Sequence, residues 1–350
     1  MLLMLSMKPK GKKVTFEHIT EKFERDMRIK KEEVRKIVDF LVNKKLIAFE
    51  NGLYKATDKG RKFFEEKLKE VEKDLEKINK SWLVIYKSKK YYHIVKDIIL
   101  EFCKDRYIGF YCLFTEKRFF RRDFRGKKIV IKNWKDLEYF INIHCIDIIP
   151  SIHKINSERP DWLVVDIDPG PKIPFSKTKE IAIETFELMK DLNLNPQIKF
   201  SGSRGFQIWS LIESFEIPKW YKPLSLKTEK RERNYFTLFS DFVRVIQREV
   251  GKKFPNLTTS SPKEKKKRED KILLDPSSMK KMGLVRAPYS IHSKTGLVSL
   301  PLNLKEVKNF NMENANIENV AKRFKRKGNE FNLKESNPQD LLELLRRYRG

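Results

Sequence analysis

Two aspartates with one residue between them stand at the end of an apolar run, in the segment DWLVVDIDPG that spans residues 161–170. Side chains alternate across a strand, so Asp166 and Asp168 would project to the same face. Two ionised carboxylates this close repel each other unless one is protonated or a cation lies between them. Carboxylate oxygens suit Mg²⁺ or Mn²⁺. The pattern predicts a site for divalent cations; the alternative is a turn in which Asp168 caps a backbone amide and Asp166 forms an ion pair.

A second segment, QIKFSGSRGFQIWSLI, begins at residue 197 and reads as strand, tight turn and strand. Its turn combines serine hydroxyls, glycines whose amides can approach a ligand closely, and Arg204 at the tip. Hydroxyl and amide donors with a fixed positive charge suit a phosphate group. The segment therefore predicts a phosphate-binding turn, and a plain glycine-rich hairpin is the alternative.

A third segment, residues 271–302, carries another carboxylate at the end of an apolar run, Asp275. Arg286, His292 and Lys294 follow it, and the last two would point to the same side if the segment is extended. Three carboxylates for two divalent ions, together with several cations for a triphosphate, predict phosphoryl transfer. Two ions can hold the attacking 3′-hydroxyl and the leaving pyrophosphate in line.

The charge of the chain favours a polyanionic partner. Lys and Arg outnumber Asp and Glu by 76 to 48, a formal net charge of +28, and nucleic acid is the first candidate for such an excess. Basic residues are interleaved with aromatic ones over residues 118–128, and Arg118, Arg121 and Arg122 are predicted to face the phosphates of DNA. The lysine-rich residues 261–270 lack apolar periodicity and predict an exposed loop.

The three cysteines exclude some classes of protein. They lie far apart with no CxxC pair, which indicates neither a disulfide framework nor a zinc site. Because no apolar run approaches about 18 residues, a cytoplasmic protein without a membrane partner is expected.

The N-terminal residues predict two amphipathic helices and then a hairpin around Asn51 and Gly52, a pair typical of type I′ turns. This is the order of a winged helix-turn-helix. Arg35 and Lys36 on the second helix would meet DNA phosphates, although many such modules bind proteins instead. A lysine- and glutamate-rich helix from Asp58 to about residue 80 would link this module to the remainder of the chain.

Over residues 82–302 the chain resembles the archaeo-eukaryotic primase superfamily. Its members carry a D-h-D motif, a second motif S-G-x-[RK]-G-x-H and a third carboxylate; DID, SGSRGFQ and LLD match these, with Gln207 in place of the histidine. RAPYSIHSKTGL, residues 286–297, looks like a signature of the replicative primase small subunit. Residues 141–171 are instead similar to the run into the acidic motif of the polymerase domain of bacterial ligase D.

The resemblance implies an α/β (α+β) primase-polymerase core with an RRM-like sheet over residues 81–303. The winged helix-turn-helix module would occupy residues 1–80, and a helical polar tail residues 304–350. A metal-dependent DNA primase or polymerase is expected, which synthesises or extends a strand on a DNA template. The expected catalytic residues, which would hold two Mg²⁺ or Mn²⁺ ions, are Asp166, Asp168 and Asp275; the expected nucleotide-binding residues are Ser201, Arg204, Gln207, Arg286, His292 and Lys294.

Two alternatives to this DNA primase or polymerase stay open. One is an end-joining repair polymerase. The other is a non-catalytic DNA-binding protein with a degenerate primase core, which Gln207 favours because an amide cannot carry charge. The expected partners are a DNA template or primer and nucleoside triphosphates, with a primase large subunit, a ligase or a helicase as further candidates. The choice between ribonucleotides and deoxyribonucleotides stays open as well.

Overall fold

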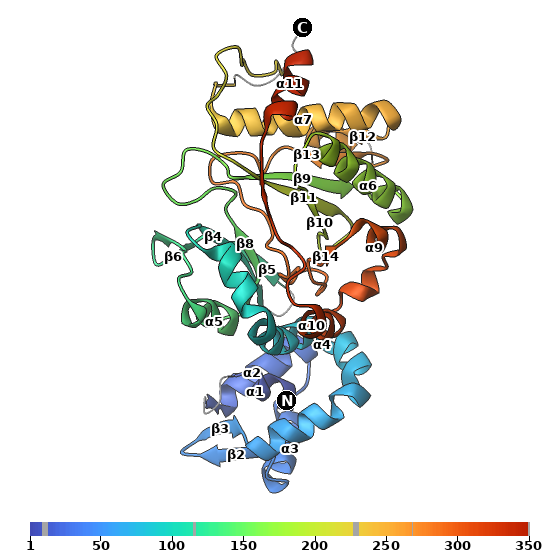
Figure 1. Cartoon of the computed structure of the whole chain (residues 1–350). Helices are drawn as coiled ribbons and strands as arrows, with labels where there is room; N and C mark the ends of the chain where they lie inside the picture. Colours follow the sequence, from blue (N-terminus) through green and yellow to red (C-terminus); the bar gives the residue numbers. More distant parts are fainter. Residues whose placement is uncertain (9–12, 115–116, 227–230, 268, 349–350) are drawn as a thin grey trace. The chain divides into compact units, whose positions relative to one another are not determined.

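The computed structural model describes residues 1–8, 13–114, 117–226, 231–267 and 269–348 (Figure 1). Its contacts divide the chain into two units. Unit 1 comprises Met1–His93, Cys112–Phe119 and Glu138–Ile146, and unit 2 comprises Ile94–Tyr111, Phe120–Leu137 and Asp147–Gly350.

The N-terminal part of unit 1 has the predicted order of helix, helix and hairpin. Apolar side chains at helical spacing form its buried core, among them Ile19 and Phe23 of α2 (Phe16–Met27) and Val34 and Val38 of α3 (Lys31–Asn43). Asn51 and Gly52 have φ angles of 52° and 76°, which confirms the predicted hairpin turn. The elements are α1 (Leu2–Ser6), β1 (Val14–Thr15), α2 (Phe16–Met27), α3 (Lys31–Asn43), β2 (Ile47–Glu50) and β3 (Leu53–Ala56), with the sheet in the order β1-β3-β2.

The predicted linking helix is present. α4 spans Asp58–Cys103 and consists of two helical segments that meet at a kink at Asn79, where the backbone angles are non-helical, so its first segment matches the helix predicted from Asp58 to about residue 80. A three-stranded sheet in the order β5-β4-β8, a two-stranded β6-β7 sheet and a helix follow it. Their bounds are β4 (Ile108–Phe114), β5 (Lys117–Arg121), β6 (Asp123–Phe124), β7 (Lys127–Lys128), α5 (Trp134–Asn142) and β8 (Cys145–Pro150).

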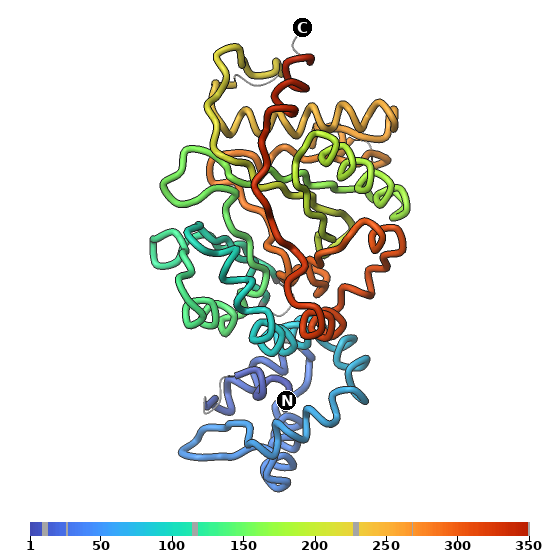
Figure 2. The backbone as a smooth tube through the Cα atoms, viewed as in Figure 1, coloured from blue at the N-terminus to red at the C-terminus, as the bar shows by residue number. Residues whose placement is uncertain are grey.

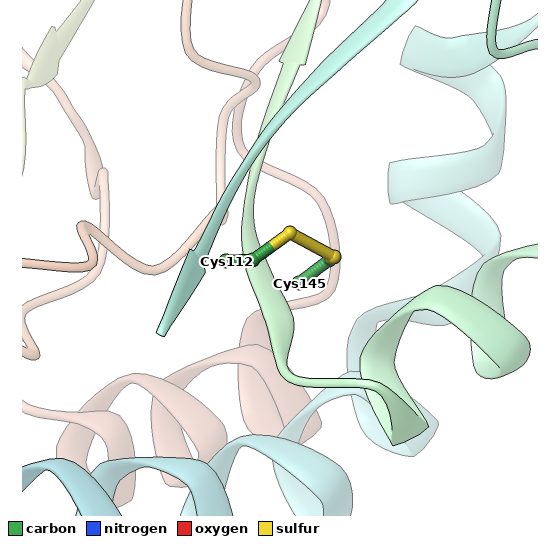
Figure 3. Close-up of a disulfide and its surroundings, with 2 residues drawn as sticks. All are labelled: Cys112 and Cys145. Atoms are coloured by element: carbon green, nitrogen blue, oxygen red, sulfur yellow. A yellow bond between two sulfur atoms is a disulfide. The ribbon is translucent and has the colours of Figure 1, made fainter. Parts of the chain in front are cut away.

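The structure contains a disulfide that the sequence analysis did not predict. Cys112 of β4 and Cys145 of β8 are both fully buried in unit 1 and form this bond (Figure 3). The prediction of no disulfide was wrong because it considered only spacing along the chain. Pairing of two distant strands brings the cysteines, which are 33 residues apart, next to each other.

Unit 2 is built on a seven-stranded sheet. Six strands follow the order β12-β13-β9-β11-β10-β14, and β15 pairs with β11. The run around the two aspartates is a strand as predicted, as are the two runs that flank the turn SGSRG. The strands are β9 (Trp162–Pro169), β10 (Gln197–Phe200), β11 (Phe206–Ile212), β12 (Thr258–Thr259), β13 (Ile272–Asp275), β14 (Pro301–Leu302) and β15 (Glu335–Ser336).

Helices α6 (Phe175–Asp191) and α7 (Tyr235–Lys253) pack against each other and against this sheet (Figure 1). The ring of Phe175 contacts Phe200 and Phe206, which therefore point to the side of α6. Residues 199 and 207 are their neighbours along the strands and must point to the opposite face. That face carries a cluster of buried aromatic rings, made of Phe102, Trp162, Trp209 and Phe331.

The lysine-rich residues 261–270 contain a short helix, α8 (Pro262–Lys267), so the prediction of a loop was wrong there; Arg268 lies outside the described residues. A helix in the polar tail was predicted and is confirmed at α11, which packs on α7. The remaining elements are α9 (Leu304–Asn309), η1 (Met312–Ala315), α10 (Ile317–Lys327) and α11 (Gln339–Arg347). No helix in the described part of the chain is long and apolar enough to cross a membrane.

Candidate active site

Four polar residues form a row across the sheet of unit 2. Lys199 of β10 lies opposite Gln207 of β11, which lies opposite Asp166 of β9, which in turn lies opposite Asp275 of β13. Directly opposed residues of antiparallel strands project to the same face, with Cβ atoms about 4.5–5.5 Å apart. Strand pairing therefore brings together Asp166 and Asp275, which are far apart in the sequence. The backbone tube in Figure 2 shows that the green segment with β9 and the orange segment with β13 lie side by side.

The carboxylates of this row disfavour each other's ionisation. Burial, followed by the charges of Asp275 and Asp168, raises the pKa of Asp166 to about 7, and a hydrogen bond from the Gln207 side chain opposes the rise. A cation that reaches this carboxyl group would stabilise its ionised form.

Each of the other two aspartates already has partners. Lys265 of α8 forms an ion pair with Asp168. The Asp275 carboxylate accepts hydrogen bonds from the Ser277 amide and hydroxyl, both at 2.8 Å. Within the described ranges, no group of three or more His, Cys, Asp or Glu side chains is arranged to hold a metal ion. Hard carboxylate oxygens fit Mg²⁺ or Mn²⁺ by their chemistry, and the assignment of a metal to them stays a prediction.

A pocket of about 200 Å³ opens beside the carboxylates. It brings together all the predicted catalytic and nucleotide-binding residues except Asp275 and Lys294. The residues that line it are Asp166, Ile167, Asp168, Ser201, Ser203, Arg204, Gly205, Gln207, Arg286 and His292.

The turn between β10 and β11 forms one wall of the pocket. Gly202 has a φ angle of +90°, a conformation that favours glycine. A Cβ atom on Gly205 would lie 2.0 Å from the carbonyl oxygen of Ile167, so only glycine lets this turn approach β9 so closely. The Ser201 hydroxyl accepts a hydrogen bond from the Gly205 amide at 3.3 Å. The two glycines therefore hold Ser201 and Arg204 next to the aspartates.

Arg286 is held by a partner that the sequence analysis missed, Asp147. Its guanidinium donates to both carboxylate oxygens of Asp147, at 2.7 and 3.0 Å, and to the carbonyl oxygen of Ser201 at 3.0 Å. Burial alone would raise the pKa of Asp147, but the charge and hydrogen bonds of Arg286 outweigh it and lower that pKa. Asp147 also accepts from the amide and hydroxyl of Ser293. A buried carboxylate thus anchors the segment that carries Arg286.

The segment of His292 and Lys294 is a turn and is not extended, so the condition under which their side chains would point to the same side is not met. They belong to a turn in which the Lys294 and Thr295 amides donate to His292 Nδ1, at 3.2 and 3.3 Å. His292 lines the pocket, whereas Lys294 is exposed and is not among its lining residues. The turn at this segment separates the two side chains that alternation would have placed together.

Lys199 is a second residue that the sequence analysis missed. It is fully buried, and its Nζ donates to Gln207 Oε1 and to Ser299 Oγ, both at 2.7 Å. Burial and then the charge of Arg286 hold the pKa of Lys199 well below its usual range. A lysine within an otherwise apolar strand, two residues before the serine of the second motif, is the signal that could have identified it.

The predicted DNA-binding residues lie in other elements. Arg35 and Lys36 are exposed on α3, and the Arg35 guanidinium lies 3.7 Å from the centre of the Phe16 ring. Arg118 and Arg121 belong to β5, and Arg122 follows it and donates to the carbonyl oxygen of Met282 at 3.4 Å. Their contact with DNA stays a prediction.

The chain is similar in sequence to known end-joining proteins. The family described as "LigD, primase-polymerase domain" matches residues 115–331. The multifunctional non-homologous end joining protein LigD of Pseudomonas aeruginosa is 26% identical over 155 residues, which is 43% of this chain and 16% of that protein. The bifunctional protein LigD of Bacillus subtilis is 26% identical over 214 residues, 61% of this chain and 32% of that protein. The chain thus spans less than a third of the length of either relative.

A solved structure supports the same relationship at the level of the fold. The polymerase domain of Mycobacterium tuberculosis ligase D, determined in complex with DNA, has a TM-score of 0.57 and 17% sequence identity to this chain. The similarity covers 69% of this chain and 88% of that domain. With the family match over more than half of the residues, these findings confirm the resemblance inferred from the three motifs. The chain belongs to the LigD primase-polymerase family of the archaeo-eukaryotic primase superfamily.

Proposed function

We propose that this chain is a metal-dependent nucleotidyltransferase that extends a nucleic-acid strand on a DNA template. The proposal rests on one observation: a single pocket is lined by two aspartates and by hydroxyl, cationic and imidazole groups. These residues are Asp166, Asp168, Ser201, Arg204, Arg286 and His292. Carboxylates on one wall suit divalent cations, and hydroxyl and cationic groups on the other suit the phosphates of a nucleotide.

Each group has a defined role in this proposal. Asp166, Asp168 and Asp275 would hold the divalent ions, which when bound neutralise phosphate charge and activate the attacking hydroxyl. The Arg286 guanidinium, fixed by Asp147, presents a permanent positive charge to the pocket. Arg204 and the Ser201 hydroxyl would bind phosphate oxygens, and His292 would bind the same group from the opposite segment. Lys294 is exposed and would contribute only if its turn moves towards the nucleotide.

End-joining repair is the favoured setting of this activity. The two LigD relatives are named for end joining, and the family is that of their primase-polymerase domain. The alternative is de novo primer synthesis. It is favoured by residues 286–297, which look like the signature of the replicative primase small subunit. A ligase is accordingly the first candidate partner, before a primase large subunit or a helicase.

We infer that DNA is held by basic surfaces outside the pocket. Residues 1–80 have the helix, helix and hairpin order of a winged helix-turn-helix, and Arg35 and Lys36 are exposed on the helix that would meet DNA. Arg118, Arg121 and Arg122 form a second basic segment. The catalytic core would then be residues 81–303, with residues 304–350 as a tail that packs on it.

A test of the proposal is strand synthesis on primed, gapped and single-stranded DNA. Mg²⁺ or Mn²⁺ and each nucleotide set are supplied, and the native protein is compared with Asp166→Ala/Asp168→Ala. Product from the native protein alone is the expected result, and addition at gapped or end-paired substrates in preference to single strands supports the repair setting. If neither protein makes product and both bind DNA equally, the core is a scaffold. That second candidate is favoured by Gln207, which cannot carry the charge of the histidine in the family motif.

A further inference from the structure

The pocket is backed by a buried pair of side chains, Lys199 and Gln207. Lys199 Nζ lies 2.7 Å from Gln207 Oε1, and the two residues are directly opposed on β10 and β11. Gln207 is in turn opposed to Asp166 on β9 and lines the pocket. The pair therefore lies between the buried interior of the sheet and the pocket wall that contains Asp166.

Two hydrogen bonds settle which way the amide of Gln207 points. Lys199 Nζ donates to the amide oxygen, Gln207 Oε1. The NH₂ group therefore points the other way, and the Gln207 side chain is a hydrogen-bond donor to Asp166. A flipped amide would set its NH₂ group against the Lys199 donor and its oxygen against the carboxyl group of Asp166, so both hydrogen bonds of this orientation would be lost.

Lys199 is itself fixed in place. It is fully buried, its second hydrogen bond goes to Ser299 Oγ at 2.7 Å, and Ser299 donates to the carbonyl oxygen of Phe200 at 3.0 Å. The ammonium also lies 5.2 Å from the centre of the Trp209 ring. Because these contacts surround Lys199 Nζ on three sides, this atom has little freedom to follow a rotation of the amide.

We propose that Lys199 is a positioning residue that fixes Gln207 as a neutral hydrogen-bond donor to the carboxylate wall and to a phosphate oxygen bound beside it. The amide has two N–H donors, so one can serve Asp166 and the other the ligand. This chain would thereby keep a donor at the position where the family motif has a histidine. The inference rests on the proposed function, because the ligand it names is the phosphate group of the nucleotide.

The competing explanation is that Lys199 only fills the core beneath the sheet. A double-mutant cycle separates the two explanations, since residues that act through one contact give non-additive losses. The cycle comprises Lys199→Met, Gln207→Leu and the combined variant. Two quantities are measured for each: kcat and KM of strand synthesis, and the rise in Tm produced by Mn²⁺ with a non-hydrolysable nucleoside triphosphate.

Loss of a donor that acts on a bound phosphate should mainly lower kcat/KM for the nucleotide. We expect Gln207→Leu to lower kcat/KM on the order of 100-fold and Lys199→Met on the order of 10-fold, with the combined variant no worse than Gln207→Leu alone. Lys199→Gln, which can still donate to the amide oxygen, should recover most of the activity. The rise in Tm produced by the nucleotide should be smallest for Gln207→Leu, larger for Lys199→Met and largest for the native protein.

Three results would overturn the proposal: losses that multiply in the combined variant, a Lys199→Met protein as active as the native one, or no recovery in Lys199→Gln. Arg106→Met is the matched control, because it removes another buried cation, one paired with Asp161 away from the pocket. It should lower Tm and leave the KM for nucleotide unchanged.

Two additions keep the test decisive. If Lys199→Met does not fold, Gln207→Glu replaces it: the carboxylate retains the bond to Lys199 but removes the donor, so a nucleotide response equal to that of the native protein would contradict the proposal. If the native protein makes no product, the proposed function fails. The nucleotide-dependent rise in Tm of the same variants then still tests the role of Lys199.

Discussion

Replacing Asp166 by Asn should make the protein more stable at pH 8 and, at the same time, inactive. In the folded chain, burial and the charges of Asp275 and Asp168 raise the pKa of Asp166 from 3.8 to about 7. The folded protein therefore keeps a proton on this group over a pH range in which the unfolded chain has lost it. The stability that results is fully present below about pH 4 and is lost as the pH rises through about 7.

The size of the effect follows from the difference between the two pKa values. A rise of about 3 pH units corresponds to about 4 kcal/mol, at about 1.4 kcal/mol for each unit. Asp166 is partly exposed, and solvent screening reduces this figure, so we expect Asp166→Asn to raise the free energy of unfolding at pH 8 by about 2 kcal/mol. For a unit of 150–250 residues that is a rise in Tm of about 4–8 °C.

The assay is denaturant and thermal unfolding of both proteins with EDTA, at pH 4.5 and pH 8. The advantage of Asp166→Asn should be small at pH 4.5 and grow with pH, and Mg²⁺ or Mn²⁺ should stabilise the native protein more than the variant. Asp191→Asn, at an exposed position at the end of α6, is the control and should change stability by less than about 0.5 kcal/mol. The reasoning is refuted if Asp166→Asn is no more stable than the native protein at pH 8, or if its advantage is equal at both pH values.

Three other substitutions test the framework of the site and the disulfide. Cys112→Ser should lower the free energy of unfolding by about 4 kcal/mol, because the bond to Cys145 closes a loop of 33 residues; reducing agent should lower the Tm of the native protein only, and equal responses would contradict this. Asp147→Asn should cost about 3–5 kcal/mol in denaturant unfolding, since it leaves the buried Arg286 without its charged partner, and a cost below about 1 kcal/mol would show that the pair is dispensable. Gly205→Ala should abolish strand synthesis and lower Tm, because its Cβ would lie 2.0 Å from a carbonyl oxygen of β9; an active variant with native Tm would count against that packing.

The sequence was sufficient where short-range patterns decide the structure. The apolar run before Asp166 and the Asn51–Gly52 pair predicted a strand and a hairpin turn, and both are present. Alternation along β9 correctly placed Asp166 and Asp168 on one face, next to the turn that carries Ser201. The motifs also identified the family, because three short segments with particular residue types rarely coincide by chance.

The errors concern contacts between distant segments. The Cys112–Cys145 disulfide depends on the pairing of β4 with β8, which neither cysteine reveals locally. The lysine-rich segment lacks apolar periodicity, yet it forms α8, from which Lys265 pairs with Asp168. Ion pairs of this kind stabilise a short helix whose own sequence has no apolar face to bury.

The amino-acid sequence by itself determined which residue types the site contains and which strands and turn carry them, because those features depend on neighbours only a few residues away. Tertiary structure alone decided that Lys199, Gln207, Asp166 and Asp275 form one row and that Asp147 anchors Arg286. Strand order and register are set by the packing of the whole sheet, so the partners of a buried charge are known only once the sheet is assembled.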